Sequence, residues 1–180
     1  MATAVVDTWG STVEERAASY PCDELIDRPD RVLYRAVDVA ASAELVFRWI
    51  CQLRAAPYSY DWIDNFGRRS PRRLTPGLEE LEPGQRVMTI FRLASFEDGH
   101  SITLDSGSAL FGRFVVTYVA VSRGDQRSRL VVKLAFSAPP GICGLAVRKL
   151  LPMGDLVMMR KQLLTLKALA ERDGGSEPSD

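Results

Sequence analysis

Residues 86–137 are the part of this sequence that most restricts its fold. Four runs rich in β-branched and aromatic residues follow one another here, with only a few turn residues between them. Strands joined by such short connections are antiparallel, because a parallel pair needs a crossover of roughly a dozen residues or more. The segment therefore predicts an antiparallel sheet, with strands over 86–96, 100–105, 112–121 and 129–137.

The run 129–137 has the clearest alternation of residue types. One face carries Leu130, Val132, Leu134 and Phe136, and the other carries Arg129, Val131, Lys133, Ala135 and Ser137. We expect the first face to be buried and the second to contact water.

A long C-terminal helix is the natural cover for that apolar face. We expect it to begin with Asp155 as its N-cap and to run to about Arg172, after a shorter helix over 142–151 that Pro152 ends. A sheet and a helix that each have one apolar face most simply bury each other. The apolar face of the helix consists of Leu156, Met159, Leu163, Leu166 and Ala170, with Val157 and Leu164 beside them.

The first half of the chain predicts one strand and three short helices. Thr12 or Ser11, with a glutamate three positions later, forms a capping box for a helix that ends near Tyr20. Residues 32–39 predict a strand. Two helices in tandem follow: one from Ala43 with the apolar stripe Val46, Trp49, Ile50 and Leu53, and one from Ser59 as N-cap to Gly67.

The composition excludes several classes of protein. With 23 Lys and Arg against 23 Asp and Glu, the chain has no overall positive field that would attract nucleic acid. His100 is the only histidine, so a multi-histidine metal site is ruled out, and we expect neither a metal nor a cofactor. We also expect no membrane-spanning segment and no signal peptide. Cys22, Cys51 and Cys143 form no C-x-x-C pair, which favours free, buried thiols and a cytoplasmic location.

The order of these elements indicates one α+β domain. A curved antiparallel sheet would wrap around the long C-terminal helix, with two short helices after the first strand and room for an internal cavity near them. Residues 1–30 would form an N-terminal extension with a short helix, 31–172 the domain, and 173–180 a disordered tail.

This order resembles the START-like superfamily, also called SRPBCC or the Bet v 1-like helix-grip fold, which includes polyketide cyclases, lipid-transfer domains and hormone receptors. The segments 47–53, 56–65 and 158–164 resemble an uncharacterised bacterial subgroup of such proteins. The resemblance covers roughly residues 30–172 and implies a helix-grip domain with an internal cavity. It transfers architecture much better than function, and it supplies no catalytic motif.

The densest group of chemically versatile side chains lies between Tyr58 and Asn65. Aromatic rings with a polar tip can hold and orient an organic molecule in a pocket. The alternative is that the rings close one end of the core while the acidic groups cap a helix or face water. The candidate ligand-binding residues are Tyr58, Tyr60, Trp62, Asn65, Phe91, Tyr118 and Met159.

Catalytic residues remain unknown at this stage, and four residues are candidates. Asp61, Asp64 and Asp105 could act as acid–base groups if burial raised their pKa values toward neutrality. His100 is the fourth candidate, although its place after Asp98 and Gly99 suggests the end of a hairpin, where an exposed and uninvolved imidazole is the alternative.

The loop from Arg68 to Arg73 holds four arginines in six residues. These guanidinium groups could bind the acidic tail of a ligand or an acidic patch on a partner. The alternative is a solvated loop in which one or two arginines pair with Glu79, Glu80 or Glu82.

Three functions follow from the expected architecture. The first is a carrier or binding protein for a small hydrophobic or amphipathic molecule, as a monomer or homodimer. The second is a cofactor-independent enzyme of the cyclase or dehydratase type, and the third is an interaction module. An open apolar cavity with a buried carboxylate or tyrosine favours catalysis, one without such groups favours carriage, and a filled core favours interaction.

Overall fold

The structure is a computed structural model that describes residues 2–64, 67–107 and 112–175. Its α-helices are α1 (Ala2–Thr8), α2 (Val13–Ala17), α3 (Ala43–Cys51), α4 (Asp61–Asp64) and α5 (Gly141–Gly174), and the short 3₁₀ helices are η1 (Pro21–Glu24) and η2 (Gln52–Arg54). Its strands are β1 (Arg31–Val39), β2 (Arg86–Val87), β3 (Phe91–Glu97), β4 (Ser101–Asp105), β5 (Arg113–Ser122) and β6 (Ser128–Ser137).

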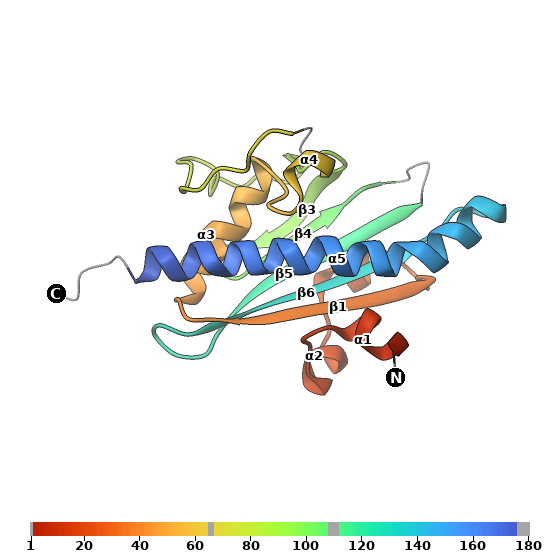
Figure 1. The fold of residues 1–180 in the computed structure, drawn as a ribbon, viewed down its shortest axis with the longest axis horizontal. Coiled ribbons are helices and arrows are strands. Elements are labelled where there is room, and N and C mark those ends of the chain that lie inside the picture. Colours follow the sequence, from red (N-terminus) through yellow and green to blue (C-terminus); the bar gives the residue numbers. More distant parts are fainter. Residues whose placement is uncertain (1, 65–66, 108–111, 176–180) are drawn as a thin grey trace.

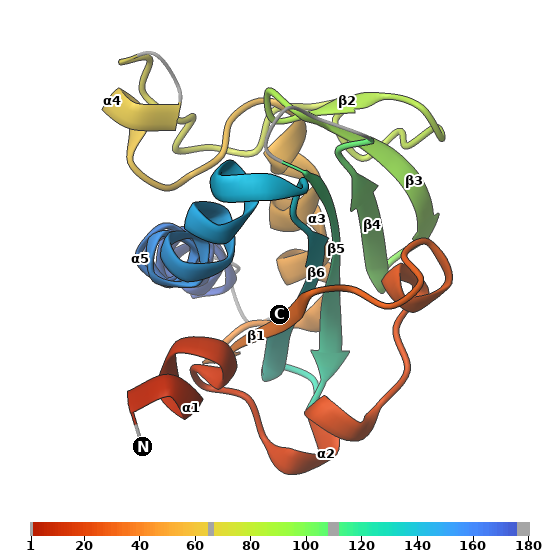
Figure 2. The ribbon, with the colours of Figure 1, turned by 90° about the vertical axis from the view of Figure 1, so that its right-hand side faces the viewer.

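The strands form one antiparallel sheet in the order β1-β6-β5-β4-β3-β2. Figure 1 shows α5 lying along this sheet, and Figure 2, which looks nearly down α5, shows the sheet curving beside it together with α3. The predicted α+β helix-grip class is confirmed, including the short helices after the first strand. The predicted strand over 86–96 is two strands, β2 and β3, separated by a turn at residues 88–90.

The core lies between the concave face of the sheet and the two helices α3 and α5. Leu130, Val132, Leu134 and Phe136 point into it from β6, as their alternation predicts. They share the core with the predicted stripe of α3 and with Met159, Leu163, Leu166, Leu169 and Ala170 of α5.

The C-terminal helix differs from the prediction in two ways. Pro152 does not end a first helix and Asp155 does not cap a second one, because both lie inside the single helix α5, whose N-cap is Pro140. A proline removes one intrahelical hydrogen bond and kinks a helix, but packing of the flanking turns can keep the helix continuous. Pro152 is buried, and Figure 1 shows the N-terminal part of α5 tilted against the rest. Val157 and Leu164, predicted beside the apolar face, are instead exposed by 52% and 39%. Leu156, predicted on that face, is not part of the core and lines a separate groove with Trp9.

The convex face of the sheet was predicted to contact water, and this prediction is wrong. Nearly every residue of β6 is buried, because the segment 9–26, here called the N-terminal cover, packs over that face. Tyr20, Cys22 and Ile26 form a second apolar cluster with Ala36, Val115, Val119, Val131 and Ala135 of the sheet. The sheet therefore has an apolar layer on each side.

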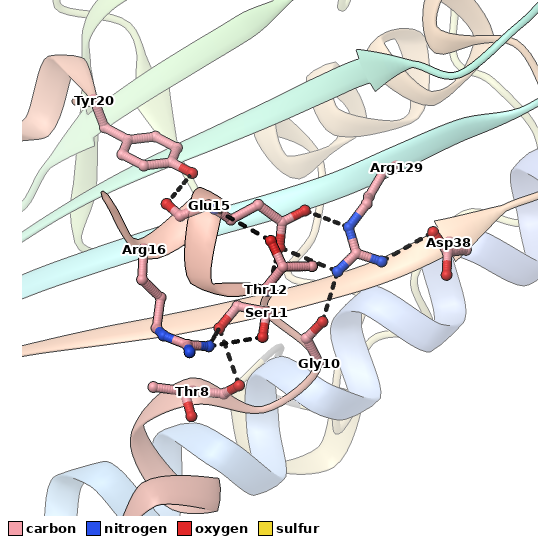
Figure 3. A network of polar contacts seen from close by, with 9 residues as sticks. All are labelled: Thr8, Gly10, Ser11, Thr12, Glu15, Arg16, Tyr20, Asp38 and Arg129. Carbon is pink, nitrogen blue, oxygen red and sulfur yellow. Dashed lines mark hydrogen bonds and ion pairs between the residues drawn. The ribbon is translucent and has the colours of Figure 1, made fainter. Parts of the chain in front are cut away.

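The two basic residues on the convex side of β6 are buried with partners from the N-terminal cover. Lys133 binds Asp23 at 2.7 Å and lies 5.1 Å and 5.4 Å from the ring centres of Tyr20 and Tyr34. Arg129 bonds to Glu15, to Asp38 and to the backbone oxygen of Gly10, as Figure 3 shows. The predicted capping box between Thr12 and Glu15 is present, so Glu15 serves both α2 and Arg129.

The N-terminal cover also occupies the free edge of the sheet. The Ala36 N–H of β1 donates a hydrogen bond of 3.1 Å to the backbone oxygen of Trp9. Gly10 has a φ of +75°, and a Cβ atom there would lie 2.0 Å from the backbone oxygen of Ala36. A glycine is required at this close approach.

The cysteines, the helix lengths and the division of the chain were also predicted from the sequence. Cys22 and Cys51 are free and buried, while the Cys143 side chain lies outside the described part of the protein. Within the described ranges, no helix is both long enough and apolar enough to cross a membrane. The division into extension, domain and tail stays a prediction; α5 continues to Gly174, and residues 176–180 lie outside the described chain.

Candidate functional site

A cavity of about 370 Å³ lies between α5 and the concave face of the sheet. Its volume is within the range of ligand pockets, roughly 300–1,000 Å³. The sheet contributes Phe91, Val116, Tyr118 and Leu134, and α5 contributes Asp155, Met158, Met159 and Gln162. The remaining lining residues are Pro57, Ser59, Ile63, Met88, Thr89 and Ile90.

Simple periodicities bring these side chains together. Val116 and Tyr118 are two residues apart on β5, so both point to the concave face, and Leu134 of β6 pairs with Val116. On α5, residues 155, 158, 159 and 162 are spaced by three or four and therefore share one side of the helix. The sheet and α5, both regular secondary structure, thus form two walls of the cavity.

Asp155, Tyr118 and Gln162 form a polar wall of the cavity, and Asp155 is paired with Arg35, which is not among the lining residues. The Arg35 side chain is 1% exposed and the Asp155 side chain 9% exposed, and Arg35 Nη2 donates to Asp155 Oδ2 at 2.6 Å. Arg35 Nη1 donates to the backbone oxygen of Tyr34 at 2.8 Å. Arg35 and Tyr118 both lie opposite Val132 in the sheet, one on each side of it, so they stand in the same row beneath α5.

Burial dominates the electrostatics of this wall. Removal of the Asp155 carboxyl from water raises its pKa to about 6, although Arg35 acts in the opposite direction. Burial likewise raises the pKa of the Tyr118 hydroxyl, and the nearby Asp155 charge adds to that effect. A carboxyl group that titrates close to neutral pH can either accept or donate a proton there.

A chain of hydrogen bonds fixes the other polar groups. Tyr118 Oη donates to Gln162 Oε1 at 2.8 Å, and Gln162 Nε2 donates to the Pro57 backbone oxygen at 2.6 Å. Met159 Sδ lies 3.7 Å from the Tyr118 oxygen. The chain links the sheet, α5 and the loop after α3, so it holds the wall of the cavity in one arrangement.

Two residues have unusual backbone conformations: Met88, which lines the cavity, and Tyr58, which lies in sequence between the lining residues Pro57 and Ser59. Tyr58 has a φ of +55° and Met88 a φ of +52°, values that cost a non-glycine residue energy. Tyr58 is buried and meets Trp49 edge to face at 5.9 Å between ring centres. At the rim of the cavity, Ile63 and Ile90 are 53% and 58% exposed.

The structure brings three of the predicted ligand-binding residues to the cavity: Phe91, Tyr118 and Met159. Tyr58 is buried next to Trp49 and is not among the lining residues. Tyr60 lines a separate groove with Trp9 and Arg160. Trp62 is 76% exposed, and Asn65 lies outside the described residues. The three aromatic residues Tyr58, Tyr60 and Trp62 are separated in the structure. The helix α4 begins only at Asp61, so Tyr58 and Tyr60 do not share a helix with Trp62.

Three of the predicted catalytic candidates, Asp61, Asp105 and His100, are not among the residues that line the cavity. Asp61 accepts hydrogen bonds from the backbone N–H and hydroxyl of Ser70. The Arg113 guanidinium binds Asp105 at 2.6 Å and lowers the pKa of that carboxyl. His100 is exposed in the turn between β3 and β4, and the Asp64 side chain is outside the described set. Among the described residues, no three His, Cys, Asp or Glu side chains gather closely enough to hold a metal ion.

Sequence reasoning missed the polar residues that do line or support the cavity: Arg35, Asp155 and Gln162. One signal was available for each. Arg35 interrupts an apolar face of β1, between Leu33 and Val37 at a spacing of two. Asp155 and Gln162 lie one helical turn before and after Met159, which was selected as a ligand-binding residue.

The fold has counterparts among solved structures. The Zhui aromatase/cyclase from Streptomyces sp. R1128 is 19% identical, with a TM-score of 0.54 over 79% of this chain and 94% of that one. A protein from Arthrobacter aurescens is 15% identical, with a TM-score of 0.52 over 78% of this chain and 86% of that one. A START superfamily protein from Mycobacterium smegmatis is 15% identical, with a TM-score of 0.50 over 78% of this chain and 97% of that one.

No protein-family model and no curated protein matches the sequence. The structural similarities have low sequence identity, and they show that this chain has the START-like helix-grip fold. Fold alone does not assign an activity, because function depends on the residues of the site.

Proposed function

We propose that this protein binds a small, largely apolar molecule in the cavity between α5 and the sheet. The observation that carries the proposal is the cavity of about 370 Å³, whose lining is mostly aliphatic, aromatic and methionine side chains. Pockets of this size and composition are the usual sites for organic ligands, which gain affinity by removing apolar surface from water. An interaction module would need no such opening in its core.

The lining also suits ligands of variable shape. Met88 lines the cavity from the turn after β2, and Met158 and Met159 line it from α5. Methionine is an adaptable side chain that fills irregular gaps. Tyr118 and Gln162, in contrast, are fixed by their hydrogen bonds. The cavity therefore combines an adaptable apolar portion with one fixed polar wall.

Filling the cavity should weaken binding. In Val116→Phe the larger side chain would occupy the space in front of β5, and the affinity for the neutral fluorescent probe N-phenyl-1-naphthylamine should fall about tenfold or more. Fluorescence titration measures this affinity. Val121→Phe is the matched control, because Val121 lies on the convex face of the same strand, next to the other apolar cluster. Equal affinities in wild type and Val116→Phe would contradict the proposal.

A second function meets the criterion for catalysis given above, because the open apolar cavity contains the buried carboxyl of Asp155 and the buried hydroxyl of Tyr118. It stands second because both groups already have partners, Arg35 and Gln162. The Asp155 pKa of about 6 makes this carboxyl a general base at neutral pH, and the apolar surroundings would strengthen its interaction with a bound substrate. The fold is shared with an aromatase/cyclase, which is compatible with this chemistry. The second candidate is therefore a cofactor-independent enzyme that moves a proton on an apolar substrate.

Nitrobenzisoxazole tests this candidate without knowledge of the natural substrate. A base removes the ring C–H proton, that bond's electron pair forms the nitrile, and the N–O bond breaks to give a coloured phenolate. We expect the rate to rise as the pH passes about 6, because the base must be ionised, and to drop about tenfold or more in Asp155→Asn. Probe binding would show that the variant keeps its fold. An unchanged rate in this variant would argue against catalysis by Asp155.

A further inference from the structure

The polar wall of the cavity has an asymmetric hydrogen-bonding capacity. Gln162 uses its carbonyl oxygen to accept from Tyr118, and its amide nitrogen donates to the Pro57 backbone oxygen and to Met88 Sδ at 3.7 Å. The Tyr118 hydroxyl has one hydrogen, and it donates this hydrogen to Gln162. Among the described contacts, Asp155 uses only Oδ2, toward Arg35. Arg35 Nε is a buried donor without a partner among the described residues, but Arg35 does not line the cavity. The capacity that remains on the lining residues Asp155 and Tyr118 consists of oxygen lone pairs, so this wall can accept hydrogen bonds from a ligand.

The charges of Asp155 and Arg35 restrict which donor group the ligand can carry. A carboxylate on the ligand would approach the Asp155 carboxylate, and the repulsion would be strong because that group is buried in a mostly apolar cavity wall. An ammonium group would approach Asp155 but also the Arg35 guanidinium, which already neutralises that carboxylate at 2.6 Å. A third charge would leave the buried group with a net charge. A neutral donor avoids both penalties.

We propose that the bound molecule is a neutral alcohol or phenol whose hydroxyl group donates a hydrogen bond to Asp155, with its apolar body along Val116, Leu134 and Met159. This inference rests on the proposed binding function and adds the chemical class of the ligand. The Arg35–Asp155 pair would act as the specificity element of the cavity, selecting hydroxyl compounds over carboxylates of the same length.

Two isomers separate the hydroxyl contact from simple apolar burial. Decanol and methoxynonane have the same formula, but the ether has no O–H donor and is the more apolar of the two. In a displacement titration of N-phenyl-1-naphthylamine from the wild-type protein, decanol should compete on the order of tenfold more strongly than the ether. Decanoate at pH 8 should be the weakest competitor of the three, because both its own carboxyl group and Asp155 are ionised there.

A double variant shows whether the preference comes from the ion pair. Asp155→Asn alone would leave the Arg35 charge buried without its partner, whereas Arg35→Met with Asp155→Leu replaces both charges with apolar groups. In this double variant the preference for decanol should disappear, while the probe still binds. Glu171→Gln is the matched control: it removes a carboxylate from the same helix, at a site where that group binds Lys167 and the Ala40 backbone, and it should leave the preference unchanged.

The outcomes distinguish this inference from the proposed function. If no probe or competitor binds, the proposed function fails. If the probe binds but the ether competes as well as decanol, binding stands and the hydroxyl assignment is overturned. Strongest competition by decanoate would also overturn it, and would indicate that Arg35 receives an anion. Should the double variant not fold, the comparison of the two isomers on the wild-type protein decides the question by itself.

Discussion

Arg129→Ala is expected to lower the free energy of unfolding by about 3–5 kcal/mol, because it leaves a buried carboxylate without its partner. The Arg129 and Glu15 side chains are each only 10% exposed, and Arg129 also donates to the Gly10 backbone oxygen at 2.6 Å (Figure 3). Loss of the guanidinium would therefore remove the hydrogen bonds that Arg129 of β6 makes to Glu15 and Gly10 of the N-terminal cover. Urea denaturation measures the change.

The other partner of Arg129 supplies the control. Asp38 binds the same guanidinium at 2.9 Å but its side chain is 82% exposed, so water screens the pair. Asp38→Ala should cost no more than about 1 kcal/mol. If the Arg129 and Asp38 variants lose equal stability, burial is not what gives this network its strength.

Leu163→Ala should destabilise the protein by about 2–5 kcal/mol, the cost of removing a large side chain from a closely packed core. Leu163 is 0% exposed in the cluster between α5 and the sheet. Its neighbour Leu164 carries the same side chain on the same helix but is 39% exposed, and Leu164→Ala should change stability by about 1 kcal/mol or less.

Thermal or urea unfolding of the two alanine variants compares them directly. The comparison cancels helix propensity, because both substitutions replace leucine with alanine one residue apart in α5. A larger loss at Leu164 than at Leu163 would mean that α5 presents a different face to the sheet.

Local patterns in the sequence were sufficient for the fold. Alternation along β6 placed Leu130, Val132, Leu134 and Phe136 correctly, and the stripe at Val46, Trp49, Ile50 and Leu53 gave the inward face of α3. These patterns are reliable because each depends on one element and one buried face. The break predicted at Pro152 was wrong, since local propensity yields to packing of the surrounding turns.

The buried convex face could not be predicted in the same way. Val131 and Ala135 alternate with Arg129 and Lys133, which is also the pattern of a wet face. What buries them is the N-terminal cover, whose contacts join residues far apart in sequence, such as Cys22 with Thr117 and Asp23 with Lys133. No periodicity within either segment indicates such a pairing.

The candidate site was predicted in part, for a related reason. Phe91, Tyr118 and Met159 were selected and do line the cavity. Asp155 was interpreted as a helix cap because it follows Pro152, and a single charged residue on a strand gave Arg35 no evident partner. The pair exists only because β1 and α5 meet in the folded protein, 120 residues apart along the chain.

The N-terminal cover is synthesised first, but it can complete its packing on the sheet only after the last strand has been made. The N-terminal cover leaves the ribosome before any strand, yet its partners Arg129 and Lys133 are on the last strand to be made. Until then the surface that its apolar side chains pack on is incomplete, because Tyr20 and Ile26 share their cluster with Val131 and Ala135 of β6. We expect this segment to dock late in folding, and a nascent chain that stalls before residue 128 to expose it to chaperones or to aggregation.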